Sequence, residues 1–170
     1  GPIYSQHRRF IMLQTSHFLI LPKMALNIVL ASIFLWPCTL PAQENISVRE
    51  GSYEVFYSAF NTSFLTPKVA SSLGIVRGDD RGLLNVSVLE HFPDGSSHPI
   101  AAKTITGSSY DLLHRRSLNF QEVVETDARY YLAPFKITND NEMIIIQVDV
   151  TPVTSDKSIA IKLERRFFHN

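Results

Sequence analysis

The chain has 170 residues, with 16 basic and 16 acidic side chains, six histidines and a single cysteine. Balanced charge argues against a nucleic-acid-binding protein, because phosphate recognition needs a basic surface. One cysteine excludes a disulfide within the chain, so the folded part must be stabilised by its core alone.

The first quarter of the chain predicts a leader. An apolar run, ALNIVLASIFLW over residues 25–36, follows Lys23 and is succeeded by two prolines and then Ala42. A basic residue, an apolar run, helix breakers and a small residue in this order are typical of a secretory signal peptide. We expect residues 1–42 to be this leader, with a possible upstream extension at its start and cleavage after Ala42.

A retained anchor is the alternative for this leader, although the run is short for a bilayer span, which needs about 20 residues. Cleavage would remove the basic residues Arg8, Arg9 and Lys23 and the only cysteine, Cys38. The remaining residues 43–170 form one domain with more acidic than basic side chains, and we expect it outside the cytosol.

Beyond Gln43 the apolar residues mostly alternate with polar ones, which is the period of β-strands. Residues 51–60 predict a strand with apolar side chains on both faces. A short helix follows, because Thr66 can cap it, Pro67 suits its first turn and Gly74 can end it.

The middle of the chain predicts two strands joined by a tight turn. Residues 77–82 read as a charged loop, and residues 84–88 alternate as a half-buried strand. Asp94-Gly95 is a hairpin signal, after which residues 100–106 return as a strand.

The pattern becomes less regular after Gly107. We expect a loop or helical turn over residues 108–116 and then a strand over residues 118–125, where a shift in the apolar phase suggests a bulge. A strand over residues 129–137 contains Pro134, which cannot donate to a ladder and therefore indicates an edge or a bulge.

The C-terminal part predicts the most regular strands. Residues 144–150 alternate as a buried face, and residues 159–168 form a last strand after a loop. About seven strands and one short helix favour an all-β fold, an immunoglobulin-like antiparallel β-sandwich. A small β-barrel is the alternative.

Four segments together carry a family resemblance. They read YEVFYSAFNTSFLTPKVASSLGI over residues 53–75, RGLLNVSVL over 81–89, DARYYLAPF over 127–135 and IQVDVTP over 146–152. In this combination the chain resembles the domain of unknown function 4426 family, small exported proteins of gammaproteobacteria. The resemblance implies a periplasmic β-rich domain and brings no activity or catalytic residue with it.

Aromatic side chains crowd the strands around residues 56–64 and 130–135, where they predict a core or a groove between sheets. Asn61, Arg81 and Tyr131 are the residues we expect at the polar rim of such a groove. His91 and His98 flank the hairpin turn but do not make a set of three convergent ligands, so we expect no metal and no cofactor.

We interpret the chain as a non-catalytic binding or interaction module, an accessory of the cell envelope with an envelope protein or peptide as partner. A membrane would be a partner only if the leader were retained. One alternative is a small periplasmic hydrolase with a site at the loop ends, for example at Asp79, Asp80, Arg81 and His114. The other is a small-ligand carrier with a barrel interior.

Overall fold

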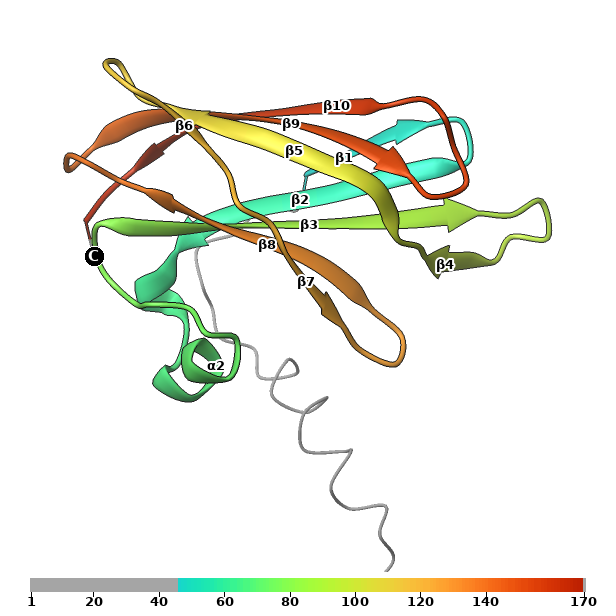
Figure 1. Cartoon of the computed structure of the whole chain (residues 1–170), viewed down its shortest axis with the longest axis horizontal. Coiled ribbons are helices and arrows are strands. Elements are labelled where there is room, and N and C mark those ends of the chain that lie inside the picture. The colour runs from blue at the N-terminus through green and yellow to red at the C-terminus, as the bar shows by residue number, and fades with distance from the viewer. Residues whose placement is uncertain (1–45, 170) are drawn as a thin grey trace, which may run out of the picture. The chain divides into compact units, whose positions relative to one another are not determined.

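The computed structural model describes residues 46–169, which fold as a sandwich of two antiparallel sheets (Figure 1). The sandwich prediction is confirmed, and the barrel alternative does not hold because each sheet stays open with two edge strands. The predicted leader, its cleavage after Ala42 and Cys38 lie outside the described residues.

The first sheet, sheet A, has six strands. In spatial order they are β1 (Ile46–Glu50), β2 (Tyr53–Asn61), β3 (Arg81–His91), β8 (Arg129–Lys136) and β7 (Gln121–Val124), with β4 (Ser97–Pro99) paired to the end of β3. Asp94-Gly95 forms the predicted turn between β3 and β4, where Gly95 has a φ of 87°.

The second sheet, sheet B, has four strands. Their spatial order is β10 (Ile159–Phe167), β9 (Glu142–Pro152), β5 (Ala102–Tyr110) and β6 (Arg115–Ser117). The described residues therefore form ten strands where the sequence predicted about seven. The excess comes from β1, β4 and β6, which have three to five residues each and are too short to show a clear alternation.

The core lies between the sheets and follows the alternation of the strands. Every second residue of the long strands points inward, which is why the predicted faces are found buried. The fully buried members with the largest volumes in this core include Leu84, Val86, Val88, Ile144, Ile146, Val148, Val150, Ile159 and Phe167.

A second, smaller apolar cluster covers the outer face of sheet A. Leu83 and Leu132 point outward there and are covered by Ile75 and neighbouring side chains of the segment that carries α2 (Pro67–Ser72). The short 3₁₀ helix η2 (Thr62–Phe64) leads into this segment. Phe60 of β2 packs against this cluster while Val55 and Tyr57 belong to the main core, so the prediction of apolar residues on both faces of the first long strand is confirmed.

Both predicted ends of the short helix are confirmed. The Thr66 hydroxyl accepts a hydrogen bond from the Val69 amide, and Pro67 occupies the first turn. Gly74 follows the helix with a φ of 67°, a left-handed conformation that favours glycine.

Two local predictions after Gly107 are wrong. Residues 108–116 are not a loop or helical turn, since β5 and β6 form a hairpin across them. The phase shift after residue 118 is not a bulge, because β7 pairs with β8 in unbroken register. The chain instead crosses from sheet B to sheet A, so Leu118 faces the core and Val123 the outer cluster.

The observed irregularity lies in β5, between Ala102 and Thr104. Pro134 lies at a local edge of sheet A, as predicted. Strand β7 pairs with β8 only over residues 129–132, so β3 is the single neighbouring strand at Pro134.

Candidate functional site

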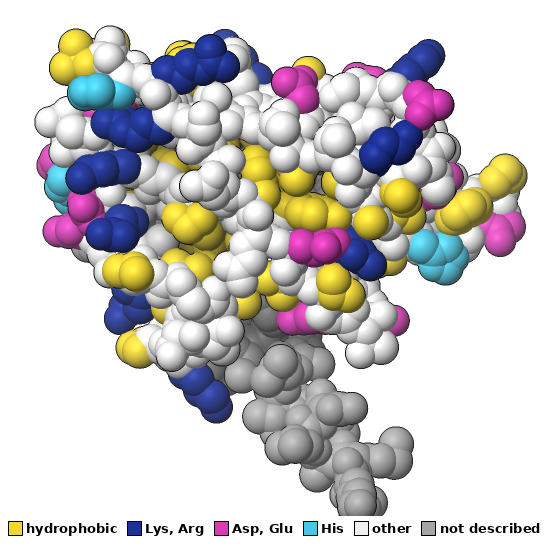
Figure 2. Space-filling model, viewed as in Figure 1, with side chains coloured by type: hydrophobic (Ala, Val, Ile, Leu, Met, Phe, Trp, Pro, Cys, Tyr) yellow, Lys and Arg dark blue, Asp and Glu magenta, His cyan; other side chains and the backbone are white. Residues whose placement is uncertain are grey.

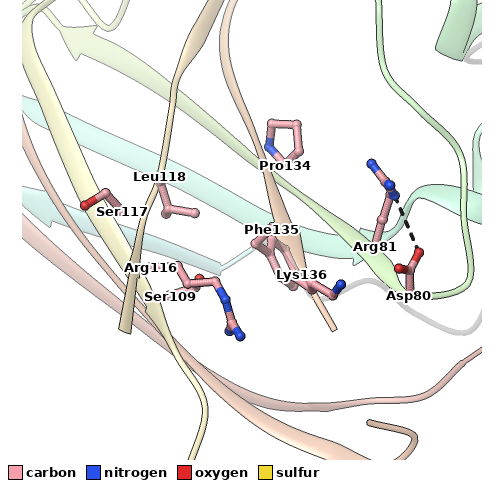
Figure 3. Close-up of a pocket in the computed structure, with 9 residues that line it drawn as sticks. All are labelled: Asp80, Arg81, Ser109, Arg116, Ser117, Leu118, Pro134, Phe135 and Lys136. Carbon is pink, nitrogen blue, oxygen red and sulfur yellow. Dashed lines mark ion pairs between the residues drawn. The ribbon is translucent and has the colours of Figure 1, made fainter. Parts of the chain in front are cut away.

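A pocket of about 250 Å³ lies at one end of the sandwich, where β3 begins and β8 ends. The β5–β6 hairpin reaches the same end from sheet B. We call this the basic end, because Arg81, Arg116 and Lys136 line the pocket. The other lining residues are Asp80, Ser109, Ser117, Leu118, Pro134 and Phe135 (Figure 3).

The apolar part of the lining rests on Phe135. Its ring packs edge-on against Phe167, with centroids 5.1 Å apart and an interplanar angle of 73°. The ring lies directly over Gly82, its partner across β3 and β8, so that a Cβ at residue 82 would overlap with it. Glycine at this position therefore permits the aromatic floor of the pocket.

Leu118 reaches the pocket from the crossing between the sheets and also depends on a glycine. A Cβ at Gly107 would come within 2.7 Å of the Gln147 carbonyl oxygen and 3.3 Å of the Leu118 Cδ1 atom. The Leu118 amide donates to the Gly107 carbonyl oxygen at 2.9 Å, which fixes the crossing against β5.

Two of the three cations come from sheet A as cross-strand neighbours. Arg81 opens β3 and stands opposite Lys136 at the end of β8. The Arg81 Nε atom lies 3.5 Å from Asp80 Oδ1, and both side chains are about half exposed. Such a solvent-exposed ion pair is weak, so the guanidinium can exchange Asp80 for another anion. No ion pair of Lys136 occurs within residues 46–169.

The third cation, Arg116, comes from β6 and is held in place by Asp111. Its Nη1 atom lies 2.7 Å from Asp111 Oδ2, and the Asp111 side chain is only 4% exposed. Burial raises the pKa of the Asp111 carboxyl, but hydrogen bonds from Arg116 and from the Leu113 and His114 amides outweigh it. The net effect holds this pKa well below its ordinary value.

The pocket thus combines cationic groups and hydroxyls with an apolar floor. Figure 3 shows Phe135 in the middle of the lining, between Leu118 on one side and Arg81 with Asp80 on the other. Chemically, the arrangement can bind an anion by charge-assisted hydrogen bonds while an attached apolar group packs on Phe135 and Leu118.

Of the three residues expected at a polar rim, the pocket contains Arg81. Asn61 is 3% exposed and donates from Nδ2 to the Phe168 carbonyl oxygen, which ties the end of β2 to the C-terminal segment. Tyr131 is 5% exposed; its hydroxyl accepts from the Ala102 amide at 2.8 Å and donates to Glu122 at 3.0 Å. Both side chains hold strands together inside the fold.

The residues named for a hydrolase do not gather as one set. Asp80 and Arg81 line the pocket, whereas Asp79 and His114 do not. The His114 Nδ1 atom lies 3.2 Å from Asp111 Oδ1 at the hairpin tip. In the described part of the chain, no three His, Cys, Asp or Glu side chains are grouped so as to hold a metal ion.

The sequence pattern did not point to Arg116, Lys136, Ser109 or Ser117 as residues of this pocket. The signal for Lys136 was available, because polar and apolar residues alternate at the end of the predicted strand that contains Pro134. Ser109 and Arg116 were hidden by the interpretation of residues 108–116 as a loop, and Ser117 lies between that range and the next predicted strand. Gly107 followed by Asp111 could have suggested a strand and a tight turn.

The chain belongs to the family described as Domain of unknown function (DUF4426), whose model matches residues 47–170. A crystal structure of a DUF4426 family protein from Pseudomonas aeruginosa PAO1 is 32% identical, with a TM-score of 0.61. The match covers 74% of this chain and 95% of that one. The resemblance seen in the four sequence segments is thereby confirmed.

A second crystal structure is FetP of uropathogenic Escherichia coli strain F11, expressed recombinantly in the periplasm of E. coli. It is 12% identical, with a TM-score of 0.46 over 75% of this chain and 95% of that one. No curated protein matches the chain. Within residues 46–169, no helix is both long and apolar enough to cross a membrane.

Proposed function

We propose that the protein is an exported, non-catalytic binding module of the cell envelope, and that the pocket at its basic end takes the carboxyl-terminal end of a peptide or envelope protein. The observation that carries this proposal is the placement of Arg81, Lys136 and Arg116 around an apolar floor. A chain terminus presents the matching chemistry, a carboxylate beside an apolar side chain.

The size of the pocket supports a terminal residue over a larger ligand. Sites for drug-sized molecules have volumes of roughly 300–1,000 Å³, whereas this pocket has about 250 Å³. A carboxylate can replace Asp80 as partner of the Arg81 guanidinium, and Lys136 lies beside it across the strand pair. The terminal side chain would then rest against Phe135 and Leu118.

The character of the lining favours binding over catalysis. Arg116 is engaged by Asp111, and Asp80 faces Arg81, so these groups are arranged to neutralise charge. Arginine and lysine side chains are suited to hold an anion by charge-assisted hydrogen bonds. Export to the periplasm with cleavage after Ala42 is part of the proposal and rests on the leader sequence.

The first test is the affinity for matched pairs of short peptides. The probes are acetylated pentapeptides ending in Leu, Phe, Val or Ala, each made as the free acid and as the amide. Isothermal titration of the protein isolated from a gammaproteobacterial host should give binding of at least one free acid. Its amide should bind at least about tenfold more weakly, because the charge-assisted bonds are lost.

Two variants locate the binding at the pocket. Arg81→Gln and Lys136→Gln should each weaken binding of the free-acid peptide, whereas Lys162→Gln should not. Lys162 is a matched control, since it is 56% exposed on β10 and does not line the pocket. Equal affinities of acid and amide, or equal losses in all three variants, would overturn the proposal.

A further inference from the structure

The tip of the β5–β6 hairpin exposes two leucines. Leu112 is 94% exposed and Leu113 is 83% exposed, the largest values among the exposed large hydrophobic residues of the described chain. Figure 1 shows this hairpin projecting at the end of sheet B. Single exposed apolar residues are common on protein surfaces, but two adjacent ones at a projecting tip indicate a docking surface.

The turn holds these leucines outward. The Asp111 carboxylate accepts hydrogen bonds from the Leu113 amide at 2.8 Å and from the His114 amide at 2.7 Å. The Asp111 amide donates to the His114 carbonyl oxygen at 3.0 Å, which closes the turn. A tip fixed by its own backbone loses little conformational freedom when it docks.

Cationic side chains follow the leucines directly. Arg116 neutralises Asp111, and the Arg115 guanidinium lies 5.1 Å from the centre of the Tyr110 ring. Tyr110 and Arg115 face each other as the last paired residues before the tip. The hairpin therefore presents two apolar residues at its tip and a positive charge behind them.

Positively charged side chains also lie around the hairpin. Lys136 and Arg81 lie at the same end, and Figure 2 shows Lys and Arg side chains following one another along one side of the molecule. Three acidic groups of this end have local partners: Asp80 faces Arg81, Asp140 accepts from the His169 amide, and Glu142 accepts from the Thr138 amide. Asp79 is exposed beside Asp80.

We propose that the β5–β6 hairpin docks the protein on a bilayer surface rich in anionic phospholipid. Leu112 and Leu113 enter the boundary between head groups and acyl chains, while Arg115 contacts lipid phosphates. Apolar residues that penetrate together with nearby basic residues give reversible attachment to anionic membranes. A projecting tip suits a fluid surface, which closes around it and needs no preformed groove.

This proposal does not depend on the peptide site, because Leu112, Leu113 and Arg115 do not line the pocket. It requires only the exposed tip and the charge behind it. It also makes the membrane a partner of the folded domain, whereas the sequence connected a membrane only with a retained leader.

The test is binding to vesicles of phosphatidylethanolamine and phosphatidylglycerol, compared with vesicles of phosphatidylcholine. The protein is the product that a gammaproteobacterial host makes from the whole chain. We expect sedimentation with the anionic vesicles, weaker at high salt. The double variant Leu112→Ser/Leu113→Ser should bind at least about tenfold more weakly, because two leucines no longer enter the bilayer.

Val153→Ser is the matched control, since Val153 is 50% exposed and follows β9 at the opposite end of that strand. It should bind like the unchanged protein. Arg115→Gln should weaken binding to the anionic vesicles several-fold and leave the melting temperature nearly unchanged, because Arg115 is exposed.

A second measurement reports on the tip itself, even in a product that keeps its leader. In a Cys38→Ser background, Leu113→Cys carries a polarity-sensitive dye whose emission should shift to the blue when anionic vesicles are added. No shift, or equal sedimentation of the double variant and the unchanged protein, would overturn the proposal. A dimer in solution that the double variant abolishes would also overturn it and assign the tip to a second copy of the chain.

Discussion

At the end of the sandwich opposite the pocket, which we call the far end, acidic side chains are paired. The Glu54 carboxylate lies 2.8 Å from His91 Nε2 and accepts from Ser47, and Asp156 lies 2.7 Å from Lys103 Nζ. At the basic end, Arg81 has only a loose partner and Lys136 has none in the described chain. The Glu54–His91 pair of the far end is largely screened from solvent, with side chains 18% and 24% exposed, whereas the cations Arg81 and Lys136 of the basic end are accessible to a ligand.

The hairpin turns at the two ends also differ in the residues that they expose. At the far end Asp94 accepts from the Ser96 amide at 2.8 Å, just as Asp111 accepts from its turn at the basic end. The first turn carries Gly95 beside its aspartate, and the second carries two exposed leucines. Because the two turns are built alike, their difference lies in what they present to the surroundings.

The largest effect is expected from Phe135→Ala, which removes the floor of the pocket. Phe135 is 5% exposed and packs on Phe167 and Gly82. Its loss should lower the free energy of unfolding by about 3–5 kcal/mol in urea denaturation. Phe92→Ala at the far end, where the ring is exposed and contacts His98, should cost less than about 1 kcal/mol. Equal losses would mean that the two ends do not differ in packing.

Asp111→Asn should come next, with a loss of about 2–3 kcal/mol at neutral pH, because a carboxylate with charged and backbone donors is replaced. The pKa of Asp111 is lowered in the folded state, so its stabilisation is complete above the ordinary value of about 3.9. It is lost as the pH falls toward the lowered pKa. The melting temperatures of the two proteins should therefore begin to approach each other below about pH 4 and converge only as the pH nears the lowered pKa.

The control for this variant is Asp94→Asn in the turn of the far end. Asp94 is exposed, and its substitution should shift the melting temperature much less than Asp111→Asn does. A difference between Asp111→Asn and the unchanged protein that persists at low pH would show that the ionised carboxylate is not the cause.

Tyr131→Phe should cost about 1–2 kcal/mol, since the Ala102 amide loses its acceptor in a partly buried position. The affinity for the free-acid peptide should not change, because Tyr131 does not line the pocket. Unfolding and titration of the same preparation check both statements. A loss of affinity without a loss of stability would place Tyr131 in the binding site after all.

The smallest effect is expected from salt. Raising the NaCl concentration from about 0.05 to 0.5 M should weaken binding of the free-acid peptide several-fold, since Arg81 and Lys136 are accessible to solvent ions. The amide should respond less. A salt-independent affinity would indicate that apolar contact with Phe135 dominates and that the cations are not used.

The sandwich could be predicted because its long strands alternate cleanly and its turns contain Gly95 and Asn141, which have positive φ. The short helix could be predicted for the same kind of reason, since Thr66, Pro67 and Gly74 act through local geometry. The sequence pattern was not sufficient to predict elements that depend on their neighbours, such as the three-residue strands β4 and β6.

The pocket could be predicted only in part for a related reason. Arg81 was found because it lies in the predicted charged loop, but its neighbour Lys136 is defined by cross-strand register. Register follows from how strands pair in space, and Arg116 joins the site only through the hairpin that the sequence did not reveal. Asn61 and Tyr131 drew attention as polar residues beside aromatics, and their burial appears only in the fold.

The most direct test of the account is charge reversal at the two ends, read as affinity for the free-acid peptide. Arg81→Glu/Lys136→Glu changes the basic end, and Lys103→Glu/Lys157→Glu changes the far end by the same amount of charge. We expect the first pair to abolish binding and the second to leave it within about twofold, because only the first faces the ligand. Equal loss in both pairs, or unchanged binding after reversal at the basic end, would contradict the assignment of the ligand to that end.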